Sequence, residues 1–294
     1  LSIRRQRQMC IRDRLKTAVL PVAGLGSRFL PITKSIPKEM LPIIDKPLIQ
    51  FAIEEAIEAG IEKIVFITSH TKKAIEDYFS INSELEKRLI QSNKENLVEK
   101  IHPKYLDKVE FSYVFQEEPN GLGHAILQAK DHVDDEFFGV ILADDLLVHK
   151  IGCLSQLSNI HNESKSSVLG VFTADPEKIS NYGVIDGVLD GNSYKLSNII
   201  EKPKAEEAPS NLAVFGRYIL SKEIFNHLEN TNPGVNGEIQ LTDAIKSLIE
   251  KDAVRAAEIM GKRFDCGSKE GYISAIIDRS LSIEKYKDAL KNLD

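Results

Sequence analysis

The stretch KTAVLPVAGLGSRFLPITKSIPKEMLPIIDKP, residues 16–47, joins an apolar run to a glycine-rich turn and a cationic continuation. The apolar run 17–22 has the composition of a buried strand, and the turn that follows contains Ala23, Gly24 and Gly26. Glycine in such a turn lets bare backbone N–H groups approach a ligand that a Cβ would block. Arg28 and Lys38 place permanent positive charge beside those amides. The stretch therefore predicts a binding site for a polyphosphate.

Two commoner glycine-rich loops fit this stretch poorly. A phosphate-binding loop of the Walker type needs Gly-Lys-Ser/Thr at a fixed spacing, and none follows the turn. A dinucleotide fingerprint needs a third glycine for close strand–helix packing, and Phe29 stands at that position. A glycine pair after a strand is by itself more often an ordinary turn than a ligand site. The two lysines and the arginine between three prolines favour the ligand site.

Composition sets the protein class. The 294 residues suffice for one large α/β domain or two small ones, and 42% apolar with 28% charged residues is typical of a globular protein. No apolar stretch approaches the ~20 residues that span a bilayer. The three cysteines, Cys10, Cys153 and Cys266, have neither metal-ligand spacing nor the pattern of a disulfide framework. We therefore expect a reducing, cytoplasmic location.

The first fourteen residues, LSIRRQRQMCIRDR, differ from the rest of the chain. They contain five arginines and one aspartate although the whole chain has a net charge of −6. They lack the apolar core of a secretory signal, and a basic arm for nucleic acid is the alternative. We expect residues 1–14 to be an extraneous or disordered segment before a natural start near Leu15. The acidic remainder should repel nucleic acid and anionic membranes.

Alternating segments predict the fold. Strands are expected at 17–22, 64–68, 110–115, 140–143, 167–173 and 212–220, and helices at 48–59, 72–79, 123–130 and 238–251. This order predicts an α/β, Rossmann-like mixed, mainly parallel sheet flanked by helices, with ligands at the carboxyl ends of the strands. Residues 183–200 should form a β-hairpin turned at 190–192. We expect one domain, 15–294, with a helical insertion at about 83–108 and a C-terminal helical region at about 273–293.

Polar residues follow two of the expected strands. Gln116 has both a donor and an acceptor, the pair that reads a pyrimidine edge, and Gly121 allows a close approach. His124 reads as a helix-start residue rather than a base. Asp144 ends a buried strand, where magnesium could bind one or two carboxylates together with phosphate oxygens. Its neighbour Asp145 should point to the opposite side.

The signature Gly-x-Gly-x-Arg-x-x-Pro-x-Thr, continued by Pro-Lys-Glu-Met-Leu-Pro and Lys-Pro-Leu-Ile, resembles the sugar-nucleotidyltransferase family. Five separated blocks share the resemblance, which covers nearly the whole chain from about Lys16. The segment SIPKEMLPIIDKP and the long insertion resemble those of the bacterial members that act on UTP and glucose 1-phosphate.

The resemblance implies a role for each block. Ala23, Gly24 and Gly26 would bind the nucleotide, and Gln116 and Gly121 would contact uracil. Glu201 would hold the sugar ring, Lys202 its phosphate, and Gly183 would let the backbone approach the hydroxyls. Mg²⁺ would bind Asp144 and Asp265, although Asp-x-Gly is also a common turn.

The implied reaction transfers the uridylyl group of UTP to glucose 1-phosphate and forms UDP-glucose and pyrophosphate. Its attacking phosphate oxygen is largely unprotonated at neutral pH, so no side-chain nucleophile is needed. Arg28, Lys38 and Lys202 would neutralise the crowded phosphates. The alternatives are a sister enzyme that uses dTTP or another sugar 1-phosphate and a regulatory subunit without turnover.

The C-terminal region raises the question of assembly. Ile273, Ile276, Ile277, Leu281 and Ile283 recur at near-helical spacing and should bury a face. This face could dock on its own domain or join subunits, and the resemblance favours a homo-oligomer. We expect neither nucleic acid nor membrane as a partner.

Overall fold

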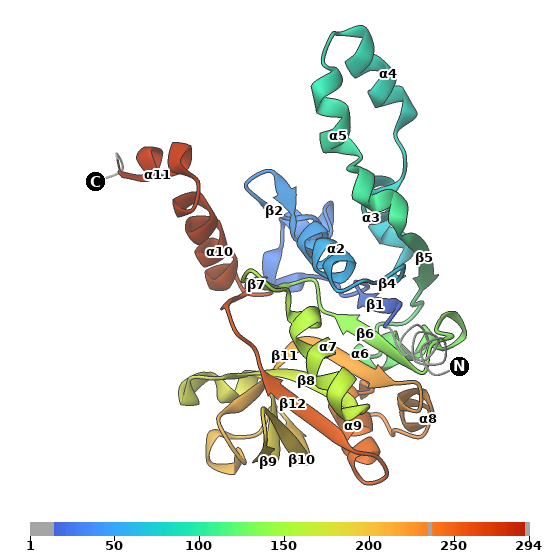
Figure 1. Cartoon of the computed structure of the whole chain (residues 1–294), viewed down its shortest axis with the longest axis vertical. Coiled ribbons are helices and arrows are strands. Elements are labelled where there is room, and N and C mark those ends of the chain that lie inside the picture. Colours follow the sequence, from blue (N-terminus) through green and yellow to red (C-terminus); the bar gives the residue numbers. More distant parts are fainter. Residues whose placement is uncertain (1–14, 235–236, 292–294) are drawn as a thin grey trace, which may run out of the picture.

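A nine-stranded sheet forms the centre of the computed structural model, which describes residues 15–234 and 237–291 (Figure 1). The segment 1–14, expected to be extraneous or disordered, lies outside the described residues. The strand order is β5-β4-β1-β6-β11-β8-β12-β10-β9. Only β11 and β10 run against the other strands. The predicted α/β class with a mixed, mainly parallel sheet is confirmed.

The elements have the following bounds. The large sheet contains β1 (Thr17–Pro21), β4 (Lys63–Thr68), β5 (Glu110–Phe115), β6 (Phe137–Ile141), β8 (Ser167–Thr173), β9 (Gly183–Asp190), β10 (Ser193–Glu201), β11 (Leu212–Ser221) and β12 (Val254–Glu258). Two short pairs are β2 (Pro42–Ile43) with β3 (Lys46–Pro47), and β7 (Asp145–Val148) with β13 (Lys262–Asp265). The helices are α2 (Leu48–Glu58), α3 (Lys73–Phe79), α4 (Ser83–Gln91), α5 (Val98–Ile101), α6 (Leu122–Leu127), α7 (Cys153–Ser164), α8 (Ile224–Glu229), α9 (Leu241–Ile249), α10 (Lys269–Leu281) and α11 (Glu284–Lys291).

Helices cover both faces of the sheet. Along β1, Ala18 and Leu20 face the cluster that α2, α3 and α7 complete, whereas Val19 faces the cluster of α6, α8 and α9. A strand with both faces buried has no polar side, which explains the continuous apolar run at 18–20. Among the described residues, no helix combines the length and apolarity needed to cross a bilayer.

The carboxyl ends of β1, β4, β5 and β6 lie at one edge of the sheet because these strands are parallel. The segments that leave them are the glycine-rich turn, the loop after Thr68, the segment from Gln116 and the turn that contains Asp144. This edge is where a doubly wound sheet binds its ligands. The topology therefore assembles segments that are far apart in the sequence.

Several elements differ from their prediction. The strand expected at 140–143 is β6, which ends at Ile141; Asp144 lies in the following turn and Asp145 begins β7. Neither α7 nor β12 was predicted. The α7 segment, CLSQLSNIHNES, is rich in Ser and Asn, which have low helix propensity, and tertiary packing overrides this preference. Its Leu154 and Leu157 are fully buried.

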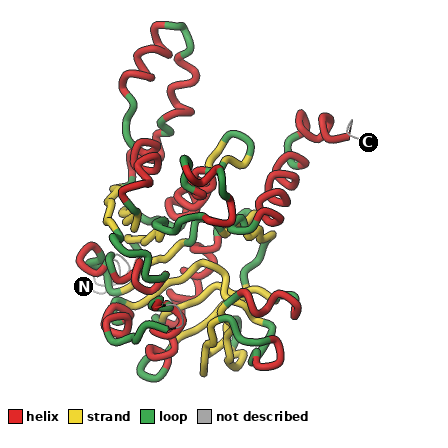
Figure 2. Tube along the Cα trace, turned by 180° about the vertical axis from the view of Figure 1, so that it is seen from behind, coloured by secondary structure: helices red, strands yellow, loops and turns green. Residues whose placement is uncertain are grey.

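Two helical segments project to the same side of the body (Figures 1 and 2). One, which we call the arm, comprises residues 83–108, the stretch predicted as a helical insertion, with α4 and α5. The other consists of α10 and α11. Of the two expected ways to bury the C-terminal apolar positions, docking on the same chain does not occur for Ile273, Ile277 and Leu281, which are about half exposed in this chain. Only the opposite side of α10, with Ala275 and Ile276, packs on the body.

Candidate active site

The glycine-rich turn folds back on the segment that follows it. Gly26 has φ 65°, and a Cβ there would lie 3.1 Å from Thr33 Cγ2 and 3.2 Å from Lys38 Cβ. The Thr33 hydroxyl donates to Gly26 O at 2.8 Å. Gly24, in contrast, has nothing within 4 Å of its Cβ position. Gly26 is therefore needed for the turn itself, whereas Gly24 faces open space that a ligand could occupy.

Lys38 lies directly against Asp144. Its Nζ donates to Asp144 Oδ2 at 2.6 Å, across 106 positions of sequence. Burial would raise the pKa of Asp144, but the Lys38 ammonium holds it below its ordinary value. Asp144 is therefore a carboxylate in this site, as a metal ligand must be.

A second carboxylate approaches Asp144 at Gly267. A Cβ on Gly267 would lie 2.9 Å from Asp144 Oδ2 and 3.1 Å from Asp265 Oδ1, so both carboxylates border the same small space. Asp265 Oδ1 accepts from Gly267 N–H at 3.0 Å, and Arg28 Nη1 donates to Gly267 O at 3.4 Å. The pairing of β7 with β13 brings these residues together.

These two carboxylates fit a magnesium ion. Within residues 15–234 and 237–291, no group of three or more His, Cys, Asp and Glu side chains is arranged to hold a metal. Mg²⁺ is usually bound by one or two carboxylates plus substrate phosphates and water rather than by a full protein cage. Asp144 and Asp265 are the residues that would hold it.

Asp145 points away from this space, as the sequence predicted. Its Oδ1 accepts from Arg263 Nη2 at 2.7 Å and its Oδ2 from Gly216 N–H at 3.1 Å. Burial raises its pKa to about 6. Sequence reasoning missed Arg263, whose guanidinium also lies 4.1 Å from the ring centroid of Phe172. The sequence signal for Arg263 is its position two residues before Asp265, in the segment RFDCG.

A buried ion pair that was not predicted from the sequence lies next to Lys38. Lys72 Nζ donates to Glu39 Oε2 at 2.8 Å, and both side chains are buried. Burial raises the pKa of Glu39 and lowers that of Lys72, so each group needs the other to stay charged. The Glu39–Lys72 pair fixes the Lys38 segment to the loop after β4.

Gly183, Glu201 and Lys202 form a second group. Gly183 and Glu201 are paired across β9 and β10, and a Cβ on Gly183 would lie 3.3 Å from Glu201 Oε2. Lys202 has φ 46°, which is uncommon for a residue with a Cβ, and its N–H donates to Tyr182 O at 3.0 Å. Its exposed ammonium lies 3.3 Å from Glu201 Oε1. This group places a carboxylate and a cation side by side at the end of a strand.

Two further residues belong to this second group. Arg263 Nη1 reaches the Tyr182 hydroxyl at 3.4 Å, so it connects the Asp145 side of the site to the strand end at Lys202. The Thr242 methyl would lie 3.0 Å from a Cβ on Gly183. The Thr242 hydroxyl is buried and makes no hydrogen bond within the described part of the chain. Nothing in the sequence context of Thr242 indicated that it lies beside Gly183.

Gln116 and Gly121 form a third group. Gln116 is buried, and its Nε2 lies 2.8 Å from His124 Nδ1 and 3.4 Å from Gly121 O. His124, read from the sequence as a helix-start residue, is in α6 and also orients this amide. Gly121 has φ 96°, and a Cβ there would lie 2.8 Å from Ile239 O. Position 121 therefore has to be a glycine because of its contact with the segment before α9, whether or not a ligand binds there.

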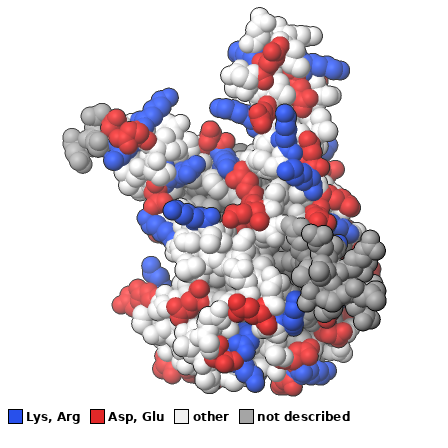
Figure 3. Space-filling view, viewed as in Figure 1, with Lys and Arg blue, Asp and Glu red and all other residues white. Residues whose placement is uncertain are grey.

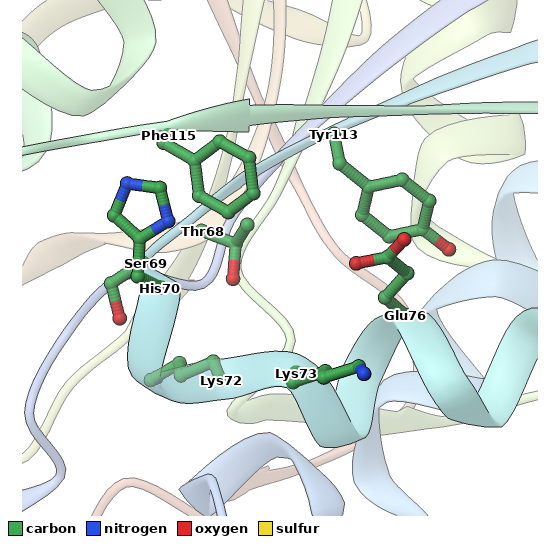
Figure 4. Close-up of a pocket in the computed structure, with 8 residues that line it drawn as sticks. All are labelled: Thr68, Ser69, His70, Lys72, Lys73, Glu76, Tyr113 and Phe115. Atoms are coloured by element: carbon green, nitrogen blue, oxygen red, sulfur yellow. The ribbon is translucent and has the colours of Figure 1, made fainter.

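A cavity of about 180 Å³ lies beside this third group, between β5 and the start of α3 (Figure 4). His70 stacks on Phe115 at its rim with 4.2 Å between ring centroids, and Tyr113 and Glu76 line its other end. None of the site residues predicted from the sequence lines it. Phe115 and Gln116 are consecutive in an extended segment, so their side chains point to opposite faces. The cavity is thus separate from the predicted nucleotide site.

The residues around Gly267 form the first group. The three groups lie along the carboxyl edge of the sheet and at the ends of β10 and β13. On the face shown in Figure 3, Lys and Arg side chains are mixed with Asp and Glu side chains between the α10 segment and the arm, where Figure 1 places α2. A site with neighbouring charges of both signs can bind a metal–polyphosphate complex, since the cations meet the phosphates and the carboxylates meet the metal.

The chain is similar to known proteins over most of its length. The chain matches the family described as nucleotidyl transferase over residues 17–280. It is 44% identical over 278 residues to the UTP–glucose-1-phosphate uridylyltransferase of Bacillus subtilis, covering 94% of this chain and 95% of the relative. The Pseudomonas aeruginosa protein of that name is 46% identical over 264 residues, covering 89% and 94%.

Solved structures show the same similarity. A crystal structure of UDP-glucose pyrophosphorylase complexed with UDP-glucose is 44% identical, with a TM-score of 0.82 and coverage of 92% of this chain and all of the other. The UTP-bound UGPase from Acinetobacter baumannii is 42% identical, with a TM-score of 0.87 and coverage of 95% and 98%.

Gly267→Ala tests whether the space between the two carboxylates holds a metal. The added methyl would fill that space, so we expect roughly tenfold weaker binding of Mn²⁺, a spectroscopic substitute for Mg²⁺. Gly267 has no left-handed φ, so the melting temperature should change little. Electron paramagnetic resonance titration with UTP present measures the binding, with Asp144→Asn as the positive control. Unchanged Mn²⁺ affinity in Gly267→Ala would place the metal elsewhere.

Proposed function

The chain belongs to the nucleotidyl transferase family, and on this premise we propose that it transfers the uridylyl group of UTP to glucose 1-phosphate. The products are UDP-glucose and pyrophosphate. The observation that carries the proposal is the convergence of Lys38, Asp144, Asp265 and Arg28 around Gly267. The names of relatives that are 44–46% identical over nearly their whole length support the choice of substrates.

In the proposed reaction, a phosphate oxygen of glucose 1-phosphate attacks the α-phosphorus of UTP. The new O–P bond forms while the bond to the β-phosphate bridging oxygen breaks, and pyrophosphate leaves with that electron pair. The attacking oxygen is largely unprotonated at neutral pH, so the barrier comes from repulsion between two anions. Arg28 and Lys38 neutralise the triphosphate, and Lys202 neutralises the sugar phosphate.

Asp144 and Asp265 hold Mg²⁺ in this proposal. The bound ion supplies further positive charge for the phosphate oxygens. Lys38 keeps Asp144 ionised through its 2.6 Å contact, so the carboxylate remains a ligand at neutral pH. Family enzymes generally use a divalent metal, and the choice of magnesium follows from the all-oxygen ligand set.

Gln116, Gly121 and Glu201 set the specificity in this proposal. The Gln116 amide, oriented by His124, meets the uracil edge, and the backbone at Gly121 approaches the ring. Ala23, Gly24 and Gly26 bring the glycine-rich turn against the nucleotide. Glu201 accepts from sugar hydroxyls, and the backbone at Gly183 approaches them. The free Thr242 hydroxyl lies on this sugar side.

Two alternatives remain testable. A sister enzyme would use dTTP or another sugar 1-phosphate; uracil and thymine differ by one methyl, worth only about 1 kcal/mol in a pocket. A regulatory subunit without turnover would be expected to lack charged residues of the site. Arg28, Lys38, Asp144, Lys202 and Asp265 are all present, and the similar proteins bear the name of the uridylyltransferase.

Pyrophosphate release is the measurement that tests the function. The full chain with Mg²⁺ should release pyrophosphate fastest with UTP and glucose 1-phosphate. The comparison set pairs UTP, dTTP, ATP, CTP and GTP with glucose, galactose and mannose 1-phosphates. A preference for dTTP would contradict the substrate assignment, and nucleotide binding without pyrophosphate release would favour the regulatory subunit.

Lys202→Ala tests the sugar-phosphate role. Removing the cation should lower kcat/KM for glucose 1-phosphate roughly 100-fold, because its charge meets the phosphates most strongly in the transition state. UTP affinity, measured by calorimetry, should change little. Lys204→Ala is the matched control, since Lys204 is an exposed lysine two residues along the chain. Lost UTP affinity in Lys202→Ala would place this lysine on the triphosphate instead.

We also propose a homo-oligomer in a cytoplasmic setting. Ile273, Ile277 and Leu281 form a stripe at i, i+4 and i+8 on the outer side of the projecting α10, and water would solvate this stripe in a lone chain. A second copy of the chain is the partner that the sequence resemblance supports. Cys153 and Cys266 are buried free cysteines, which is consistent with a reducing compartment.

Ile277→Asp tests the assembly. A charge in the middle of the stripe should convert the oligomer to a monomer, because a buried unpaired carboxylate is strongly disfavoured. Light scattering at micromolar concentration measures the mass. Leu189→Asp, on the exposed hairpin of β9 and β10, is the matched control and should leave the mass unchanged. A monomeric wild-type chain would contradict the assembly proposal.

A further inference from the structure

A buried arginine lies behind the turn that contains Asp144. Arg217 is in the middle of β11 and only 2% exposed. Its Nε and Nη2 donate to the two carboxylate oxygens of Glu55, in α2, each at 2.9 Å. A buried guanidinium is costly unless it is paired and all its N–H groups are bonded. The pair with Glu55 occupies one edge of the planar guanidinium group. The remaining N–H groups of Arg217 need other acceptors.

Those other donors hold both ends of the turn 142–145. Arg217 Nη1 donates to Leu142 O at 2.8 Å, and Nη2 donates to Asp145 O at 2.8 Å. The carbonyls before and after the Ala143–Asp144 step are therefore bonded to one rigid, planar group. A lysine could not do this, since a single ammonium cannot span acceptors in a fixed fork geometry.

Gly216, the residue before Arg217, bonds the same turn through its backbone. Its N–H donates to Asp145 Oδ2 at 3.1 Å and its carbonyl accepts from Leu142 N–H at 2.9 Å. A Cβ on Gly216 would lie 2.8 Å from both Asp145 Oδ2 and Leu142 Cβ. The turn is therefore pressed against a strand position that has room only for hydrogen.

Packing alone does not hold the turn from the other side. A cavity of about 140 Å³ lies between α2 and the start of β7, and Arg217, Glu55 and Asp145 line it. Side chains bordering a void lose the contacts that would otherwise fix them. On this side, the hydrogen bonds from Arg217 and Gly216 therefore constrain the turn.

We propose that Arg217 is a positioning residue for the reaction, supported by Glu55 and Gly216. It holds the turn 142–145 so that the Asp144 carboxylate faces Asp265 and Lys38, while Asp145 faces Arg263 on the opposite side. Arg217 does not touch the substrates; it acts through the two carbonyls that flank Ala143 and Asp144. This role rests on the proposed function, since it concerns the metal-binding carboxylate of that site.

Arg217→Lys and Gly216→Ala test the role from two directions. Arg217→Lys keeps a positive charge beside Glu55 but cannot donate to both Leu142 O and Asp145 O. Gly216→Ala keeps Arg217 and displaces the turn. In both variants we expect roughly tenfold weaker Mn²⁺ binding by electron paramagnetic resonance, with UTP present, and a kcat at least roughly tenfold lower. The affinity for UTP without metal and the KM for glucose 1-phosphate should stay within about threefold, because those contacts lie elsewhere.

Gly139→Ala is the matched control. Gly139 is a buried glycine on the neighbouring strand β6. The atoms nearest to a Cβ there would be the movable end of Leu154, at 3.2 Å, and Ala18 Cβ, at 3.6 Å. Its Mn²⁺ affinity and kcat should equal those of the wild type even if its melting temperature falls. A variant that merely loosens the fold would behave like this control.

The outcomes separate this inference from the proposed function. If the wild type neither binds Mn²⁺ nor releases pyrophosphate, the function itself is wrong. If the wild type does both, and both variants fold and retain Mn²⁺ affinity and kcat within twofold, the positioning role is wrong. It is also wrong if neither variant folds while Gly139→Ala does, because the contacts would then serve only the fold.

Discussion

The charge balance around Asp144, Asp145 and Asp265 is the constraint on which the rest of the site depends. Three carboxylates lie close together in a partly buried region, and the charges on Asp144 and Asp265 help to raise the pKa of Asp145, which burial raises first. Burial acts against the charged forms of Asp144 and Asp145, and each of these two carboxylates lies against a cation. Lys38 pairs with Asp144 and Arg263 pairs with Asp145. The proposed metal would lie in the space at Gly267 that Asp144 and Asp265 border.

This constraint explains why charged residues occur in otherwise apolar elements. Arg217 is fully buried in β11, next to Phe215 and Ile219, and its charge is compensated by Glu55 and by two backbone carbonyls. A buried ion pair is weak evidence for stability, because desolvation of the ions offsets their attraction. Its value here is geometric, since it fixes the direction in which Asp144 points. The Glu39–Lys72 pair does the same for the segment of Lys38.

Much of the fold could be predicted from the sequence because it depends on local patterns. The apolar runs of β1, β4, β5, β8 and β11 are bounded by turn residues, and each strand begins within one residue of its predicted start. The short pair β7–β13 was not predicted, because four-residue strands carry little periodicity. That pair aligns Asp145 with Asp265, 120 positions apart, so the element that was not predicted is the one that brings Asp265 to the site.

The sequence by itself determined the α/β class, the glycine-rich turn and the identity of the charged residues, because apolar periodicity and residue chemistry are properties of short sequence segments. The tertiary structure alone decided which of these charges meet. Lys38 reaches Asp144 because the parallel strands β1 and β6 place their carboxyl ends at one edge. Arg263 reaches Asp145 because β13 pairs with β7. The roles proposed for Arg217 and Gly216 depend on contacts between distant segments, which no local pattern encodes. Contacts of this kind arise from the packing of distant segments, and for this reason they appeared only with the fold.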